Sequence, residues 1–402
     1  MAKKKHRVVL KRHAFYRTIA MPFLRIYAFL KGYRNKSHFK IRKGQNYLVL
    51  SNHQTDFDGI FAMLSFNKIL YAVATDTALS NGLPSRIFHH CFGVIPKKKG
   101  ITDFEANRNM LRCFEEGGSL LLFPEGNRTY AEFQFSFGAH FAKFVKTLKK
   151  DLILFNIHGG TGCYPRFGNK KRKGKFYGKV RRVLRYDEYK DMPEDDLYQL
   201  ISENLKVYDS QSGQKFESNK RAEYLERMLF VCPKCGKVGG IYSEGNFVKC
   251  SHCGFEAEYT NELKLIPNDK SVNVNKLLDW FNYQIRYINN KEITDEIIFS
   301  DDDVELYATK IYEKRKLVSK GKMELYKDKL IIGETVIQLS EIRNASPTGC
   351  RKMGFSTNKQ DYFVIGNTRF NNLKYVFMFN KLETEMKQSD TDIYYCLEER
   401  KE

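Results

Sequence analysis

Four cysteines in two closely spaced pairs restrict the fold of this chain more than any other feature of its sequence. The pairs read CPKC and CSHC, and fourteen residues separate them. Two such pairs supply the four thiolates of a tetrahedral zinc site, and the glycine after each pair allows the tight turn that the metal requires. We predict a small zinc ribbon with a structural metal, held by Cys232, Cys235, Cys250 and Cys253. His252 could replace one of these ligands, although four cysteines suffice.

The remaining cysteines and the N-terminus favour a location on the cytoplasmic side. The other five of the nine cysteines lie at irregular spacings, so a disulfide framework is not indicated. The apolar stretch after the basic N-terminus is interrupted by Arg17 and Arg25 and has no small-residue cleavage site. We therefore predict no signal peptide.

The chain is long enough for two or three domains and is strongly basic. It has 402 residues, a hydrophobic fraction of 42% and an aromatic fraction of 14%, which together indicate a globular protein. Its 68 lysines and arginines exceed its 47 acidic residues, which gives a formal net charge of +21. This charge favours an anionic partner, either nucleic acid or an acidic membrane, and does not choose between them.

An apolar segment near the N-terminus is too short to cross a bilayer. Ala14 to Leu30 falls short of the roughly 20 residues that a spanning helix needs, and it holds two arginines. Pro22 should kink the segment or split it into two short helices. We expect a helix pair in the headgroup layer of an anionic membrane, with a helix packed on the protein's own core as the alternative.

Short apolar runs alternate with helical stretches from Gln45 onward, among them YLVLSN, SLLLFPEG and LILFNIHGG. This alternation is typical of an α/β domain with a largely parallel sheet, whose catalytic groups lie where strands end. Further along, Asp187 to Asn204 and Val274 to Asn290 are predicted as helices. Met323 to Phe379 has the pattern of short strands separated by turns, which predicts a small antiparallel β domain.

A histidine and an aspartate follow the first of these apolar runs. In LVLSNHQTDFDG, His53 comes directly after the strand, and Asp58 lies five residues later at the start of a predicted helix. Histidine exchanges a proton near neutral pH, and a carboxylate beside it can fix its tautomer and stabilise its charged form. Asp56 could take the same role. Taken alone, this spacing is better explained by a helix-capping or core histidine.

A second motif follows another apolar run. In SLLLFPEGNRTY, the residues directly after the strand are Glu125, Gly126, Asn127 and Arg128. An arginine can bind a phosphate through two hydrogen bonds, and a glycine lets the backbone approach a ligand closely. Glu125 could hold Arg128 in place or accept a hydrogen bond from a glycerol hydroxyl. A structural turn with an ion pair explains each residue separately but explains the ordered string less well.

The two motifs, in this order and about seventy residues apart, resemble those of the glycerolipid acyltransferase superfamily, in particular its branch of 1-acyl-glycerol-3-phosphate acyltransferases. That family carries NHxSxxD, then GxIFIDR, then FPEGTRS. The resemblance covers roughly Gln45 to Tyr208. It implies an acyltransferase-like α/β sheet with flanking helices, and an HX4D motif in which His53 is the general base and Asp58 orients it.

The resemblance also implies a binding site for the phosphate of the acceptor, formed by Glu125, Gly126 and Arg128. Two departures from the family pattern affect this site. Asn127 replaces the usual threonine, and GVIPKKK stands where the middle motif is expected. The second change aligns Lys99 with a phosphate-binding arginine, and a lysine keeps the charge but lacks the planar fork. The identity of the acceptor therefore stays open.

The resemblance implies an enzyme of phospholipid synthesis at the cytoplasmic face of an anionic membrane, to which it binds as a peripheral or monotopic protein. It would move a fatty acyl group from acyl-CoA or acyl-ACP to the hydroxyl of a lysophosphatidate-like acceptor. Two alternatives stay open. The ribbon and the basic run NKKRKGKFYGKVRR would suit a nucleic-acid-binding protein, and the altered middle motif would suit a lipid-binding scaffold with an inactive site.

The C-terminal strand pattern resembles a pleckstrin-homology-like barrel, which implies lipid or protein contact, and a domain that only stabilises the enzyme is the alternative. We divide the chain into membrane-associating helices (1–42), an acyltransferase domain (43–228), the zinc ribbon (229–260), a helical linker (261–300) and the β domain (301–402).

Overall fold

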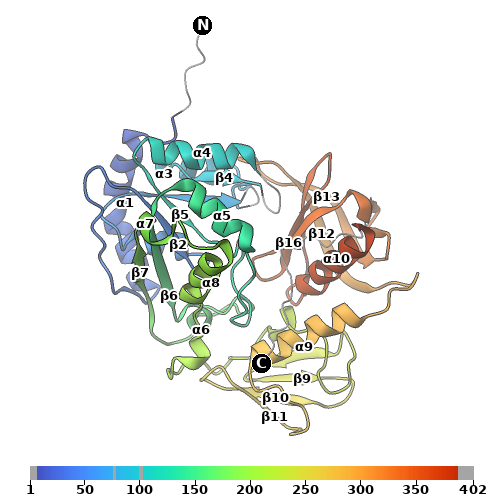
Figure 1. The fold of residues 1–402 in the computed structure, drawn as a ribbon. Helices are drawn as coiled ribbons and strands as arrows, with labels where there is room; N and C mark the ends of the chain where they lie inside the picture. Colours follow the sequence, from blue (N-terminus) through green and yellow to red (C-terminus); the bar gives the residue numbers. More distant parts are fainter. Residues whose placement is uncertain (1–6, 76–77, 99–102, 388–402) are drawn as a thin grey trace.

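The computed structural model describes residues 7–75, 78–98 and 103–387 and has three parts (Figure 1). The first is a mixed α/β sheet with helices on both faces. The second is a four-stranded antiparallel sheet that carries the cysteine pairs, and the third is a seven-stranded antiparallel β domain. This arrangement confirms the predicted fold class.

The α/β sheet brings the ends of its parallel strands to one edge. Strands β6, β2, β5, β3 and β4 run parallel, whereas β7 pairs antiparallel with β6 and parallel with β1. The predicted catalytic motifs follow β2 and β5, which are neighbours. The order across the sheet is β1 (Tyr33–Asn35), β7 (Phe176–Leu184), β6 (Asp151–His158), β2 (Tyr47–Ser51), β5 (Ser119–Leu122), β3 (Leu70–Thr75) and β4 (Ile95–Lys97).

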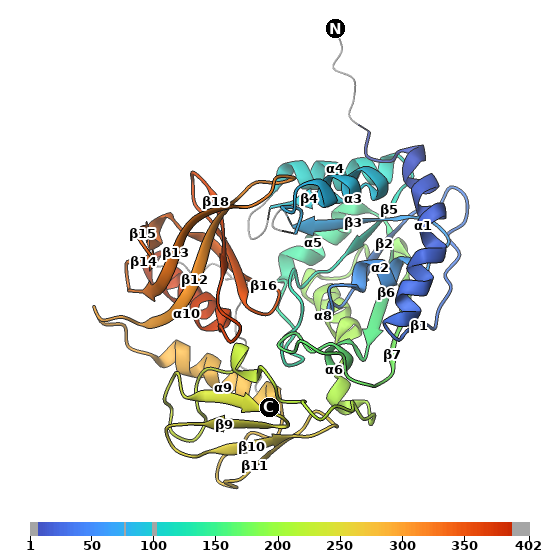
Figure 2. The same cartoon turned by 180° about the vertical axis from the view of Figure 1, so that it is seen from behind.

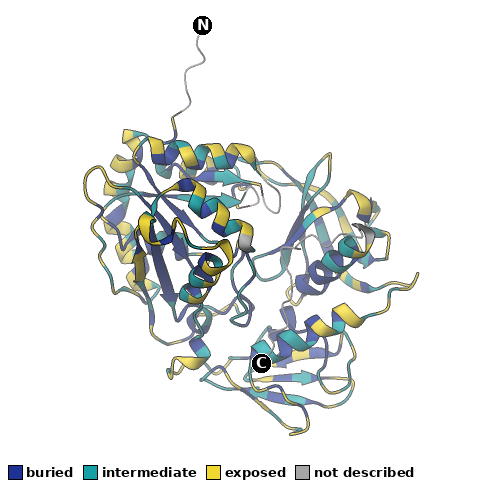
Figure 3. Ribbon diagram, viewed as in Figure 1, coloured by how far each residue is buried: buried dark blue, intermediate teal, exposed yellow. Residues whose placement is uncertain are grey.

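Helices cover both faces of this sheet because successive side chains of a strand point to opposite sides. Val49 and Leu121 belong to a core shared with α1 and α2, and Leu50 and Leu122 belong to one shared with α4, α5 and α8. Figure 3 shows the buried strands between helices whose outer faces are exposed. The helices are α1 (Lys11–Leu30), α2 (Asp58–Met63), α3 (Leu83–Phe92), α4 (Phe104–Glu115), α5 (Ala139–Leu148), α6 (Gly160–Cys163), α7 (Tyr186–Tyr189) and α8 (Glu194–Leu205).

Helix α1 continues through Pro22, so the N-terminal segment is one helix and not the predicted pair. Thr18, whose carbonyl cannot bond to Pro22, is exposed, as is Pro22 itself, so water can satisfy that carbonyl. Met21 and Ala28 pack into the core of the α/β part. None of the described helices combines the length and the apolar character that a bilayer-spanning segment needs.

The sheet that carries the cysteines has the order β11 (Leu265–Pro267), β10 (Glu256–Tyr259), β9 (Phe247–Cys250) and β8 (Ile241–Glu244). Helix α9 (Leu277–Asn290) lies within the segment predicted to be helical, and its Trp280 indole donates to the Val231 carbonyl at 2.7 Å. Strand β11 pairs with β10, so this sheet extends beyond residue 260, where we predicted the ribbon to end. Two 3-10 turns precede it, Asp209–Gln211 and Leu225–Arg227.

The β domain is an antiparallel sheet closed by a helix. Its strand order is β15 (Thr335–Gln338), β14 (Lys329–Ile332), β13 (Lys316–Leu325), β12 (Phe299–Thr309), β18 (Asp361–Ile365), β17 (Lys352–Ser356) and β16 (Arg343–Thr348). A 3-10 turn, Leu339–Glu341, precedes β16, and helix α10 (Asn372–Lys387) follows β18. The predicted strands extended to Phe379, which lies in α10. Residues 373 and 375–379 are all buried, and an apolar run buried on all sides cannot be told from a strand by periodicity.

Two turns of the β domain form hydrogen bonds with the α/β part. Between β12 and β13, the Tyr312 N–H donates to the Leu79 carbonyl at 2.9 Å, and Arg86 Nε donates to the Tyr312 carbonyl at 3.0 Å. Between β16 and β17, the Gly349 carbonyl accepts hydrogen bonds from the α/β part. Figure 2 shows β16 on the side of the β domain that faces the α/β sheet.

Candidate active site and metal centre

His53 lies at the carboxyl end of β2, where the chain turns toward α2. The Asn52 amide fixes this turn, because it donates to the Ile157 carbonyl at 2.9 Å and accepts from the Ile157 N–H at 2.8 Å. The His53 ring stacks on Phe123 with 4.4 Å between the ring centroids, and 23% of the His53 side chain is exposed. The imidazole is therefore held in place while part of it stays open to solvent.

The buried carboxylate of Asp58 contacts this imidazole. Asp58 Oδ2 lies 2.9 Å from His53 Nδ1 and also accepts from the backbone N–H groups of Gln54 and Thr55, at 2.5 and 2.8 Å. Asp58 Oδ1 accepts from the Thr55 hydroxyl at 2.5 Å. A carboxylate bound to Nδ1 keeps the proton on that nitrogen, so Nε2 is the basic atom of the ring.

Asp56, the other aspartate considered as a partner of His53, forms an ion pair with Arg128 instead. The Asp56 side chain is 71% exposed and that of Arg128 is 12% exposed. Desolvation by neighbouring atoms raises the pKa of Asp56, but the interactions with Arg128, His53 and Arg166 outweigh this effect and hold the pKa below its usual value. An ionised carboxylate therefore lies among basic side chains close to the imidazole.

Glu125 is buried near His53. Arg128 pairs with Asp56, so Glu125 does not hold Arg128 in the way that the sequence suggested. Burial raises the pKa of Glu125 to about 8, and the Asp58 carboxylate adds to the rise, whereas the backbone N–H groups of His53 and Phe135 oppose it. Its Oε2 has no hydrogen-bond partner among the described residues. The carboxyl group is mostly protonated at neutral pH, so it can donate a hydrogen bond as well as accept one.

A small cavity joins His53 to Glu125. It is lined by residues 52–54, 205–208, Glu125, Thr129, Glu132 and Gln134. Its volume of about 20 Å³ holds about one water molecule and no acceptor lipid.

The remaining predicted substrate-binding residues lie in the turn after β5 or outside the described residues. Gly126 has a φ of +62°, a conformation that favours glycine, and it is exposed. The Asn127 side chain is buried beside it. Lys99 lies outside the described residues. Lys97, at the end of β4, is described, and burial lowers its pKa.

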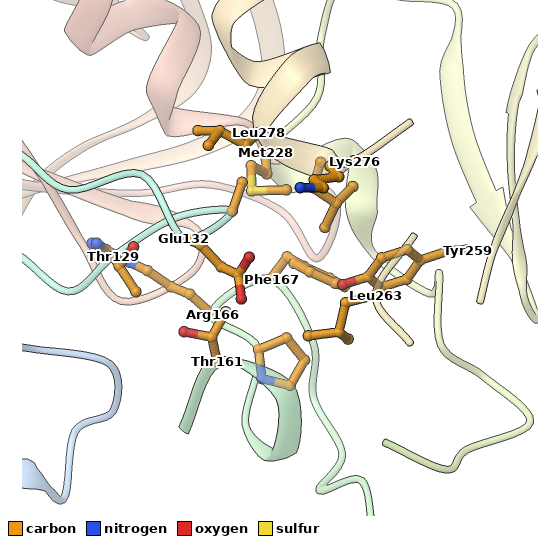
Figure 4. A pocket seen from close by; sticks show the side chains of 13 residues that line it. Thr129, Glu132, Thr161, Arg166, Phe167, Met228, Tyr259, Leu263, Lys276 and Leu278 are labelled. Carbon is orange, nitrogen blue, oxygen red and sulfur yellow. The ribbon is translucent and has the colours of Figure 1, made fainter. Parts of the chain in front are cut away.

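Two acids that the sequence analysis missed, Glu132 and the buried Asp209, lie next to this site. Figure 4 shows the Glu132 carboxylate at a second cavity, of about 10 Å³, which Arg166 also lines. Glu132 accepts from the Ser210 N–H at 2.7 Å, and burial together with the charge of Asp209 raises its pKa to about 7. Asp209 accepts from the Gly159 N–H at 2.7 Å, and burial raises its pKa to about 6. Neither acid stands in a motif, so no sequence signal marks it.

The four paired cysteines form a candidate metal centre, since their sulfur atoms all lie within 4.8 Å of one another. The sulfurs of Cys232 and Cys253 are 3.7 Å apart, and those of Cys235 and Cys250 are 3.9 Å apart. Tetrahedral zinc with bonds of about 2.3 Å would separate its sulfurs by about 3.8 Å, so the set fits this ion. The glycines after the two pairs both have a φ of +68°, as the predicted tight turns require.

The comparisons with known proteins define the class of the first part of the chain. Residues 33–155, which include His53, Asp58 and Arg128, match the family model described as Acyltransferase, so the α/β part contains an acyltransferase domain. Among solved structures, the 1-acyl-sn-glycerophosphate (LPA) acyltransferase PlsC from Thermotoga maritima is similar, with a TM-score of 0.39 and 17% sequence identity. That similarity covers 49% of this chain and 76% of the other. No curated protein sequence matches the chain.

Proposed function

We propose that this protein transfers a fatty acyl group from acyl-CoA or acyl-ACP to the hydroxyl of a lysophosphatidate-like acceptor. The observation that carries the proposal is the 2.9 Å contact between His53 Nδ1 and Asp58 Oδ2 inside an acyltransferase domain. His53 Nε2 takes the proton of the acceptor hydroxyl, whose oxygen attacks the thioester carbonyl. The tetrahedral oxyanion then collapses, the carbon–sulfur bond breaks, and the imidazolium returns the proton to the leaving thiolate.

Arg128 supports a negatively charged acceptor. Its guanidinium is mostly buried, and it holds an exposed carboxylate, that of Asp56, close to the imidazole. An acceptor phosphate that bound Arg128 would place the rest of a small glycerolipid near His53, which converts a random encounter into a positioned reaction. Lys99 remains part of the proposal as a second cation.

Exposed apolar side chains on α1 and α3 support docking on a membrane. On α1 five of them recur every three or four residues, and α3, which contacts α1, adds three more. The exposed residues are Phe15, Ile19, Phe23, Ile26, Phe29 and Leu30 of α1, and Leu83, Ile87 and Phe88 of α3. Such a face can enter the headgroup layer, and the net charge of +21 favours anionic lipid there. These features support the proposal of a peripheral or monotopic enzyme, whose location we propose to be the cytoplasmic face of a membrane.

The two C-terminal parts fit supporting roles. Four cysteine ligands leave a zinc ion no open coordination position, so the metal would stabilise the ribbon. The order of the seven antiparallel strands and the helix α10 after them support the proposal that this domain is pleckstrin-homology-like and has a role in lipid or protein contact.

The composition of the basic run from Asn169 to Arg182 favoured nucleic-acid binding, but its structure gives this function less support. Phe176 is buried, and the Tyr177 ring stacks on His158 with 4.8 Å between centroids and lies 3.7 Å from Lys36 Nζ. Both aromatic rings therefore contact the protein, and neither is free to stack on a base.

The test is acyl transfer from a labelled donor to a panel of acceptors that includes lysophosphatidate, glycerol 3-phosphate and neutral lysolipids. His53→Ala should lower turnover by at least about a hundredfold, the lower end of what a positioned general base contributes. Full activity of this variant would refute the mechanism, and preference for neutral acceptors would refute the role of Arg128. Lipid binding without transfer by the unaltered protein would favour the scaffold, and salt-dependent RNA or DNA binding without lipid binding would favour the nucleic-acid alternative.

A further inference from the structure

The exposed Asp56 carboxylate marks a place where cations from several segments converge. Arg128, from the turn after β5, forms an ion pair with it, and His53 and Arg166 are close enough to lower its pKa. Lys352, which belongs to the C-terminal β domain, also lies within the electrostatic range of Asp56. The Asp56 carboxylate therefore interacts with basic groups of both the acyltransferase domain and the β domain.

Lys352 lacks an acidic partner of its own. It begins β17, and its ammonium group enters no salt bridge within the described part of the chain and lies 6.0 Å from the centre of the Phe363 ring. Burial lowers the pKa of Lys352, as do the charges of Arg315 and Arg351, while Asp56 raises it. A half-buried ammonium group beside two guanidinium groups is unfavourable until an anion binds there.

The contacts of Arg166 hold this part of the β domain against the Arg128 segment. The Gly349 carbonyl, in the turn that leads into β17, accepts from Arg166 Nε at 2.8 Å and from the Tyr130 hydroxyl at 3.2 Å. The same Arg166 guanidinium donates to the Arg128 carbonyl and lies 3.8 Å from the centre of the Tyr130 ring. The position of Lys352 relative to Arg128 is therefore fixed by direct hydrogen bonds between the two domains.

We propose that Lys352 and Arg128 together form a phosphate-binding site between the β domain and the acyltransferase domain, which Asp56 occupies until a phosphate displaces it. A phosphate monoester has more negative charge than the Asp56 carboxylate and offers three acceptor oxygens, so it can bind Arg128 through two hydrogen bonds and still reach a second cation. That the phosphate belongs to the acyl acceptor rests on the proposed function. The acyltransferase domain without the β domain would lack half of this site.

The site can be tested by calorimetry on the full chain without an acyl donor. The probes are a short-chain lysophosphatidate, hexanoylglycerol phosphate, and its uncharged counterpart, monohexanoylglycerol. Lys352→Met should weaken binding of the phosphate probe by about tenfold, because it removes one charge-assisted contact. Binding of the uncharged probe should be unchanged. Asp56→Asn should strengthen binding of the phosphate probe several-fold. Lys359→Met, an exposed lysine in the turn after β17, is the matched control and should change neither affinity.

Unchanged phosphate affinity in Lys352→Met, or an equal loss for both probes, would overturn the proposal, and so would weaker phosphate binding in Asp56→Asn. If Lys352→Met does not fold, Asp56→Asn decides by itself, since it alters an exposed side chain. Transfer assays on the same proteins separate this site from the enzymatic function. Charge-selective binding without any acyl transfer would refute the enzymatic function and support the phosphate site. Acyl transfer with an unchanged KM for lysophosphatidate in Lys352→Met would support the enzymatic function and refute the phosphate site.

Discussion

The Asp58 carboxylate is completely buried, and it lies 2.9 Å from His53 Nδ1. Asp58→Asn keeps the size of the side chain, but its amide can donate to Nδ1 and so favour the tautomer with the proton on Nε2, which cannot act as a base. We expect kcat to fall by about a hundredfold or more. Initial rates at saturating acceptor measure this loss.

The matched control for that substitution is Asp187→Asn. Asp187 is 83% exposed and pairs only with Lys190 of the same surface turn among the described residues, so its loss should leave kcat unchanged. Equal rates for Asp58→Asn and the unaltered protein would show that the carboxylate only stabilises the turn.

Glu125 should make the stability of the protein depend on pH. Burial raises its pKa from 4.5 to about 8, so the folded protein keeps a proton that the unfolded chain releases. Its contribution to stability is therefore complete below about pH 4.5 and is lost as the pH rises toward 8. Glu125→Gln should remove on the order of 5 kcal/mol of this dependence. Urea unfolding at acidic, neutral and alkaline pH provides the free energies.

For Glu125→Gln, the free energy of unfolding is compared with that of the unaltered protein at each pH. The variant should be more stable at alkaline pH and similar at acidic pH, while the surface substitution Glu203→Gln, at a side chain that is 61% exposed, should follow the unaltered protein. A constant difference at all pH values would mean that Glu125 is ionised in the folded state.

The cysteine centre should hold one zinc ion per chain. Because all four ligands come from the protein, removing the metal should lower the unfolding temperature of the protein, and Cys253→Ser should do the same. Metal analysis of the purified protein and thermal unfolding with and without a chelator measure these effects. Cys91→Ser, outside the cluster, is the control. Purified protein that is folded and free of metal would contradict the assignment.

The apolar face of α1 should carry membrane binding. Replacing Phe15, Ile19 and Phe23 together by serine removes side chains that are 62%, 50% and 69% exposed, so folding stability should change little. Each such side chain contributes roughly 1.5–3 kcal/mol when it is fully buried, so binding to anionic vesicles should weaken by at least about a hundredfold. Flotation with anionic vesicles measures this binding. Ile266→Ser, at a residue that is 57% exposed on the ribbon, should float like the unaltered protein.

Local patterns in the sequence predicted much of the fold. The apolar runs before His53 and before Glu125 became neighbouring parallel strands, and the cysteine spacing led to one compact cluster. In each case the residues that meet are close in the sequence or are brought together by the regular geometry of a sheet. The helix around Phe379 was missed for the converse reason, since burial on all sides removes the periodicity that distinguishes a helix from a strand.

The parts of the candidate site that could not be predicted depend on contacts between domains. The two aspartates after His53 could be assigned to different partners only when Arg128 was placed in space. Lys352 lies some three hundred residues from His53 in the chain, and Arg166 belongs to no motif. Their positions follow from the docking of the β domain, which leaves no periodic or compositional signal in either segment.

Arg227 connects the three parts of the molecule through a single buried guanidinium group. It donates to the Phe167 carbonyl at 2.8 Å and the Asn169 side chain at 2.7 Å, and to the Thr368 carbonyl of the β domain at 2.6 Å, while its own segment leads into the ribbon. A truncation before Thr368 would leave this buried cation short of an acceptor, at a cost of about 1–3 kcal/mol. The three parts should therefore unfold in one cooperative transition, and a deletion that spares the acyltransferase motifs would still weaken the protein around them.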